Sequence, residues 1–243
     1  MSAWALAGMM LSVMLAAATQ RVTGLGFALV SAPLLVLTTG PISGVLLANL
    51  LSLVTNLIVL AQTWRQVDVR RVLLLIIPAL CLVPVGQVVA HHLPATVLMI
   101  GIGGLVLAAL AAVRMLRRTA LFRGPGGAVA AGALSGFMNV TAGVGGPAIT
   151  LYAIGSRWPH YSFVGSMQLY FAILNTGSII AKGLPQVGTT ALAAALSALG
   201  LGLILGHFAA RRITPERARA AVLVLAVAGA SGTILKGVIL SLS

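Results

Sequence analysis

Long apolar segments without a charged residue, separated by short basic clusters, dominate this chain and constrain its fold more than any other feature. Only 7% of the residues are charged, whereas a soluble domain carries roughly a quarter. Such a composition cannot cover a surface exposed to water, so the chain is a membrane protein. Because roughly 20 apolar helical residues cross a bilayer core, 243 residues allow about eight crossings and no sizeable soluble domain.

The basic residues form three clusters between apolar blocks. The formal net charge is +13, because only Asp68 and Glu216 are acidic. On a soluble protein this excess would suggest a nucleic acid as partner, but between membrane spans it is what the positive-inside rule produces. We therefore expect no nucleic-acid partner and place all three clusters in the cytoplasm. Their members are Arg65, Arg70 and Arg71; Arg114, Arg117, Arg118 and Arg123; and Arg211, Arg212, Arg217 and Arg219.

The segment 124–156 is uncharged, too long for one span and interrupted by glycines. A plain count of apolar blocks gives three crossings between the second and third basic clusters, which would put these clusters on opposite sides of the membrane. A turn at Gly143, Gly145 and Gly146 that sends the chain back restores the parity. We therefore predict a broken, re-entrant hairpin here, and a second one in residues 1–40, which have the same character.

The two interrupted regions begin two copies of a repeat. At a constant offset of 119 the matching pairs are Gln20 and Asn139, Gly24 and Gly143, Gly26 and Gly145, Asn49 and Gln168, and Asn56 and Asn175. Further along, His91 and His92 hold the place of Arg211 and Arg212, which indicates that the two copies lie on opposite membrane faces. We predict inverted repeats with both termini in the periplasm; two parallel four-span halves are the alternative.

The predicted fold is an all-α polytopic membrane protein in which each repeat is a broken hairpin followed by three transmembrane helices. The N-terminal repeat covers residues 1–116, with its hairpin at 3–39 and helices at about 41–63, 72–90 and 94–116. The C-terminal repeat covers residues 124–243, with its hairpin at 124–156 and helices at about 160–182, 186–210 and 216–240.

The glycine breaks are the candidate binding region. Irregular backbone at membrane depth is tolerated only where protein buries it or where it lines a watered cavity. Glycine turns can direct several amide hydrogens at an anion, and a helix N-terminus adds partial positive charge. Amide side chains seven residues apart give the helix after each hairpin a polar stripe. The candidate substrate-binding residues are Gln20, Arg21, Thr23, Gly24, Gly26, Asn49, Asn56, Asn139, Thr141, Gly143, Gly145, Gly146, Gln168 and Asn175.

Each of these features also has a purely structural interpretation. Glycines allow close helix packing, and amide side chains form interhelical hydrogen bonds. Arg21 either pairs with an anion or anchors the hairpin tip at the cytoplasmic face. Lys182 and Lys236 are expected to extend to the outer interface, and Cys81 is expected in the core. Trp64 and Trp158 are expected to be interfacial anchors.

Several function classes are excluded by what the apolar blocks lack. They contain no Asp or Glu, the carboxylates on which cation pumps and proton-coupled carriers commonly depend. No zinc-protease, aspartate-pair or serine-hydrolase motif is present, so we expect no enzymatic activity. A single cysteine and the adjacent His91 and His92 do not make a metal site, His207 is most simply a packing residue, and no cofactor is expected.

The glycine-rich segments resemble a known family. Thr23-Gly-Leu-Gly-Phe-Ala-Leu-Val-Ser-Ala-Pro-Leu-Leu-Val-Leu37 returns as Ala142-Gly-Val-Gly-Gly-Pro-Ala-Ile-Thr-Leu151, and this pair is similar to the paired motif of the sulfite exporter TauE/SafE family. Through the two repeats the resemblance covers nearly the whole chain. It departs from the family pattern at Phe27 and Ala28, where glycine is usual. It implies a bacterial inner-membrane carrier of sulfite, sulfoacetate or related sulfur-containing anions and organic acids.

We therefore expect a secondary transporter of small anions that works by alternating access between the two repeats. The expected partners are a small anionic substrate and the lipid bilayer, with a homo-oligomer possible. One alternative is uptake of an organic acid with protons or sodium. An alternative of another class is a membrane scaffold or enzyme partner without transport.

Overall fold

The protein is an all-helical bundle in the computed structural model, which describes residues 2–23, 26–116, 122–210 and 212–242. The helices in chain order are α1 (Ala3–Thr23), α2 (Phe27–Thr39), α3 (Pro41–Thr63), η1 (Trp64–Gln66), α4 (Val69–His92), α5 (Ala95–Leu116), α6 (Gly124–Ala142), α7 (Gly146–Gly155), α8 (His160–Lys182), α9 (Thr189–Ala209) and α10 (Pro215–Leu242). Among the described residues, seven helices are long and apolar enough to cross a membrane: α1, α3, α4, α5, α8, α9 and α10. The predicted all-α polytopic class is confirmed.

Glycine, proline and one carboxylate set the starts of the helices that follow the first hairpin. Gly40 has φ 84° and lets the chain turn between α2 and α3, and Pro41 takes the first position of α3, where a backbone N–H is not needed. The Asp68 side chain accepts a hydrogen bond of 3.1 Å from the backbone N–H of Arg71. This cap starts α4 at Val69, slightly earlier than the sequence predicted.

Each interrupted region folds back on itself. Gly8, near the start of α1, lies against Thr38, near the end of α2. Gly155, at the end of α7, lies against Phe122, which precedes α6, and Arg123 Nε donates to the Gly155 carbonyl over 3.2 Å. Both regions are therefore antiparallel hairpins. Their second arms, of 13 and 10 residues, are too short to cross a hydrocarbon core of about 30 Å.

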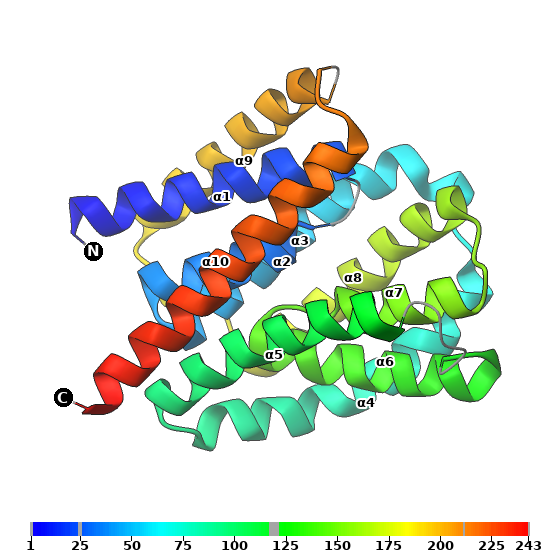
Figure 1. Ribbon diagram of the computed structural model, residues 1–243, viewed down its shortest axis with the longest axis horizontal. Helices are drawn as coiled ribbons and strands as arrows, with labels where there is room; N and C mark the ends of the chain where they lie inside the picture. The colour runs from blue at the N-terminus through cyan, green and yellow to red at the C-terminus, as the bar shows by residue number, and fades with distance from the viewer. Residues whose placement is uncertain (1, 24–25, 117–121, 211, 243) are drawn as a thin grey trace.

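The two halves of the chain interlock through the first arms of the hairpins. In Figure 1, α1 runs beside α9 along the top of the bundle and α6 runs beside α4 along the bottom. Glycines allow close approach in both contacts. A side chain at Gly206 would collide with the backbone of Ala18, and one at Gly86 would collide with Val140 and approach the Phe137 carbonyl.

Helices α3 and α8 form the interior of the bundle and pack on each other. In each, 56% of the most apolar window is buried, compared with 28–33% in the other five candidate spans. Gly165, near the start of α8, lies against Thr63 at the end of α3 and against Gln66 of η1, so the two helices are antiparallel. The polar stripes predicted on these two helices are thus enclosed in protein.

Helices α5 and α10 make a second antiparallel contact. Gly103 lies against Ala230 and Ile234, whereas Gly237, later in α10, lies against Met99, earlier in α5. Both chain ends lie on the same side of the molecule (Figure 1).

Two side chains lie where the sequence did not place them. Cys81 was expected in the core and is exposed on the outer face of α4. Trp158 was expected to be an interfacial anchor, but it is only 7% exposed and packs edge-on against Tyr152 and Phe163. The guanidinium of Arg71 lies 5.0 Å from the centre of its ring, a cation–π contact that joins the two halves.

Candidate functional site

The break between α6 and α7 is built from glycines with different tasks. Gly143 has φ 72°, a left-handed conformation that glycine adopts without strain, and it ends α6. Gly145 packs so closely on α6 that a Cβ atom there would lie 2.8 Å from the Ser135 carbonyl oxygen. At Gly146 a Cβ atom would meet nothing within 4 Å outside its own helix and its chain neighbours. The break is therefore tight on its α6 side and open at the first residue of α7.

Asn49 of α3 faces this break from the other half of the chain. Its side-chain Oδ1 lies 3.7 Å from the position that a Cβ atom of Gly143 would occupy, and the residue is only 1% exposed. Within the described part of the chain, neither Oδ1 nor Nδ2 has a hydrogen-bond partner. The Ser52 hydroxyl, one turn further along α3, has none either. A buried amide without partners costs free energy, so this position needs an explanation other than packing.

A second group of polar side chains lies beside the break and is joined by hydrogen bonds. Asn139 Nδ2 donates to Asn175 Oδ1 over 3.0 Å and to the Ser178 hydroxyl oxygen over 3.2 Å. All three residues are buried, and they join α6 to α8. Of the predicted site residues, Asn139 and Asn175 are thus brought together, but in a bond that stabilises the fold near the break.

The first break is organised differently. Gly26 precedes α2 with φ 142°, and Gln20 Oε1 accepts a hydrogen bond of 3.0 Å from the backbone N–H of Phe27. The repeat offset matches Phe27 with Gly146, and the Phe27 ring is 2% exposed. The space left open at the second break is therefore matched by a buried phenylalanine at the first. Gly24 lies outside the described residues.

Two basic residues lie near the breaks. Arg21 is in the last turn of α1, and its Nη1 lies 3.5 Å from Gln62 Oε1 on α3. Lys182 is the last residue of α8, and its Nζ donates to the carbonyl of Val140, close to the end of α6. Lys182 was expected to extend to the outer interface. Its contact with Val140 beside the break could not be predicted, because hydropathy does not specify how a helix is rotated.

The remaining predicted residues lie on helices α1, α3, α6 and α8. Thr141 donates its hydroxyl to the Phe137 carbonyl of its own helix over 2.7 Å. Gln168 is buried on α8, and its Nε2 donates to the Val164 carbonyl. Asn56 is buried on α3, and Thr23 ends α1, with its side chain outside the described part of the structure.

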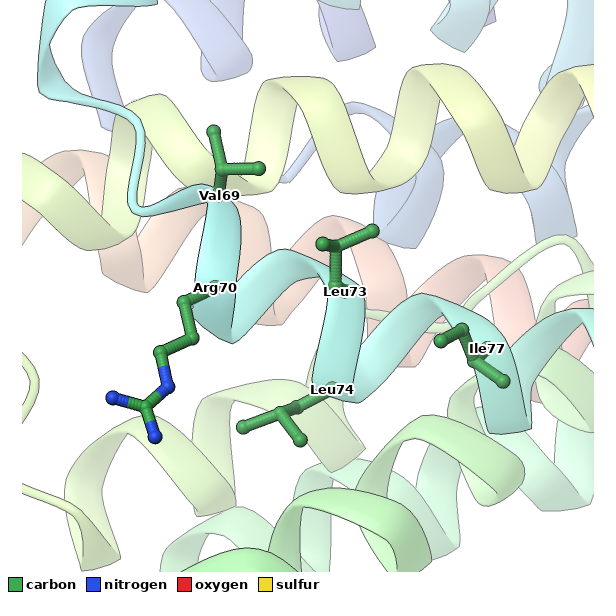
Figure 2. Close-up of a pocket in the computed structure, with 5 residues that line it drawn as sticks. All are labelled: Val69, Arg70, Leu73, Leu74 and Ile77. Carbon is green, nitrogen blue, oxygen red and sulfur yellow. The ribbon is translucent and has the colours of Figure 1, made fainter.

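Two hollows on the described structure are lined by neither Asn49 nor Gly143, although the smaller one reaches Thr141 and Ala142 at the end of α6. One of about 400 Å³ is a shallow depression on the outer face of α4, shown in Figure 2, whose side chains are apolar apart from one arginine. It is lined by Val69, Arg70, Leu73, Leu74 and Ile77. Another, of about 150 Å³, has a lining from α4, α5 and α6 that includes Thr141. Neither gathers several polar groups, as a binding site for a small anion requires.

Comparison with known proteins gives one match. A family model described as "Sulfite exporter TauE/SafE" matches residues 9–232. No curated protein and no solved structure matches the chain. The matched range contains the second hairpin, most of the first and nearly all of the helices that follow them.

Proposed function

Because the chain belongs to the sulfite exporter TauE/SafE family, we propose that it carries small sulfur-containing anions, such as sulfite or sulfoacetate, across the bacterial inner membrane. The substrate is proposed to bind at the second break, between α6 and α7, and to be exposed alternately to the two sides of the membrane. The family match supports the substrate class, and the geometry of the second break supports the place of binding.

The unpaired amide of Asn49 is the observation that carries this proposal. A buried polar group left without partners costs about 1–3 kcal/mol, and a ligand that accepts or donates the missing bond recovers this free energy. Asn49 Nδ2 offers two N–H donors to an anion, and Ser52 offers a hydroxyl on the same helix face. The open position at Gly146 lies at the N-terminus of α7, where the helix dipole also favours negative charge.

The charge distribution favours an anion over a cation. The only two acidic residues, Asp68 and Glu216, stand at the starts of α4 and α10. Apart from these helix starts, the spans carry no carboxylate that would repel an anion at the second break. An inside-negative potential contributes about 2.3 kcal/mol per 100 mV to the export of a monovalent anion, so export requires no coupling ion.

The packing of equivalent helices supports alternating access between inverted repeats. The offset of 119 relates α3 to α8, and these helices pack antiparallel. The corresponding helices α5 and α10 do the same. Helices that are equivalent in two inverted halves run in opposite directions, whereas those of parallel halves run the same way. Binding near the contact between the halves lets their relative movement expose one site to either side.

Flux measurements on proteoliposomes test the proposal. The purified protein is reconstituted, and efflux of sulfite, sulfoacetate and acetate is followed with and without an inside-negative potential. We expect flux of at least one sulfur anion that saturates and is accelerated by the potential, with acetate carried more slowly. Equal rates in protein-free liposomes would refute transport, and a preference for acetate would favour the organic-acid alternative.

A further inference from the structure

Arg21 and Lys182 take part in equivalent contacts of the two repeats, in which a hairpin helix meets the helix that follows the hairpin. The cation lies on a different one of these two helices in each repeat. In the first half the cation is on the hairpin, where Arg21 of α1 reaches Gln62 of α3. In the second half the cation is on the following helix, where Lys182 of α8 reaches the carbonyl of Val140 on α6. At the offset of 119, position 140 is the repeat equivalent of position 21, and positions 181–182 are the equivalents of 62–63.

The surroundings of the two contacts are equivalent as well. A side chain at Gly206 of α9 would collide with the Cβ atom of Arg21, and one at Gly86 of α4 would collide with the side chain of Val140. Positions 21 and 140 are therefore held by the corresponding helix of the other half, against a glycine in each case. The two contacts therefore agree in the packing around them as well as in sequence spacing.

The two cations lie at opposite ends of the bundle interior. Gln62, the partner of Arg21, is near the end of α3, and Lys182 is at the end of α8. Because α3 and α8 are antiparallel, their final residues point to opposite ends. Lys182 follows Ser178 by one turn, and Ser178 accepts the hydrogen bond from Asn139 beside the second break.

From this arrangement we propose that Lys182 is a substrate-positioning residue, the counterpart of Arg21 on the other side of the membrane. Each cation attracts the anion at one mouth of the path and passes it to the neutral donors at Asn49. The proposal rests on the proposed anion transport. Lys182 Nζ uses one of its three N–H groups on Val140, and Arg21 uses one of its five on Gln62, so both keep donors for an anion.

The chain contains a matched control for the structural role of such a lysine. Lys236 of α10 donates from Nζ to the Leu37 carbonyl over 2.7 Å, near the end of α2. It therefore also satisfies one of the last carbonyls of a hairpin helix, as Lys182 does for α6. The contact of Lys236 is exposed and is not one of the two equivalent contacts made by Arg21 and Lys182. Replacing Lys236 therefore reports only the loss of a partner for a backbone carbonyl.

Sulfite flux from each side of proteoliposomes with a fixed protein orientation tests the proposal. We expect Lys182→Gln to raise the KM about tenfold for sulfite supplied at the side where α8 ends, with little change in KM from the other side. Arg21→Gln is expected to show the opposite asymmetry. Lys182→Arg should keep the wild-type KM, because it keeps the charge, and Lys236→Gln should leave both KM values unchanged.

The outcomes separate this proposal from the function on which it rests. Wild-type flux with no side-specific effect of Lys182→Gln, or with an effect equal to that of Lys236→Gln, would overturn the role of Lys182 alone. Absence of wild-type flux for every sulfur anion would overturn the proposed function. Lys182→Met, which keeps the apolar stem of the side chain, provides the same comparison if Lys182→Gln does not reach the membrane.

Discussion

Asn49 and Gly143 belong to different halves of the chain and meet at the break between α6 and α7, where the amide of Asn49 is buried without a hydrogen-bond partner among the described residues. Proteins rarely leave both ends of an amide unpaired inside their fold. Burial of the Asn49 amide without a partner therefore costs free energy, and its N–H groups are donors that a bound anion can use.

Replacing Asn49 by leucine separates stability from function. Asn49→Leu keeps a similar shape and removes the unpaired donor and acceptor, so we expect it to raise the free energy of unfolding by about 1–3 kcal/mol and to abolish anion flux. Thermal unfolding in detergent and flux in proteoliposomes measure the two effects. Asn139→Leu is the control, because it breaks the bonds to Asn175 and Ser178 and should lower stability. A loss of stability in Asn49→Leu would instead show that this amide has a structural partner.

The open position at Gly146 gives a second test of the binding site. Gly146→Phe places at the second break the side chain that Phe27 supplies at the first, and we expect it to fold and to lose flux because the ring fills the anion's space. Gly146→Ala adds only a methyl group and should retain flux. Membrane yield and flux are measured for both variants. Wild-type flux in Gly146→Phe would place the substrate elsewhere.

The glycines between the halves predict a symmetric pattern of stability. Gly86→Ala and Gly206→Ala introduce a Cβ atom where α4 meets α6 and α9 meets α1, so each should cost about 1–3 kcal/mol through overpacking. At Gly101 and Gly200 a Cβ atom meets nothing within 4 Å, so alanine there should be neutral or stabilise by up to about 1 kcal/mol. Equal effects at all four positions in thermal unfolding would argue against the close helix contacts.

Site-directed labelling tests the inverted topology. In a background with Cys81→Ser, a cysteine at His92 should react with a membrane-impermeant maleimide added outside cells, whereas one at Gln66 should react only after permeabilisation. A reporter enzyme that is active only in the periplasm should be active when it is fused to the C-terminus. Labelling of both positions from the same side would contradict the predicted orientation.

The fold class could be predicted because it depends on properties that every membrane protein must satisfy. Uncharged segments of sufficient length and basic loops specify helices that cross a bilayer, and the antiparallel hairpins follow from glycines that interrupt such segments. The division into repeats at residues 1–116 and 124–243 remains a prediction, which the pairing of Gly86 and Gly206 supports.

Burial within the bundle could not be predicted in the same way. Lipid and protein interior are both apolar, so the composition around Cys81 does not distinguish a residue that faces lipid from one that faces the core. The rotation of α8, which turns Lys182 toward Val140, depends on packing against α3 and α6. For the same reason the sequence placed Asn49 and Asn139 together among the candidate binding residues, although the Asn49 amide has no partner among the described residues and Asn139 Nδ2 donates to Asn175 and Ser178.

The most direct test of the central claim is a titration of wild-type protein and Asn49→Leu with sulfite, followed by thermal unfolding. A ligand that binds only the folded state adds about 2.7 kcal/mol of stability at a concentration of 100 Kd. We predict that sulfite raises the Tm of the wild-type protein in a concentration-dependent manner and leaves the Tm of Asn49→Leu unchanged. An equal rise in both proteins, or none in the wild type with any sulfur anion, would contradict an anion site at Asn49 and the second break.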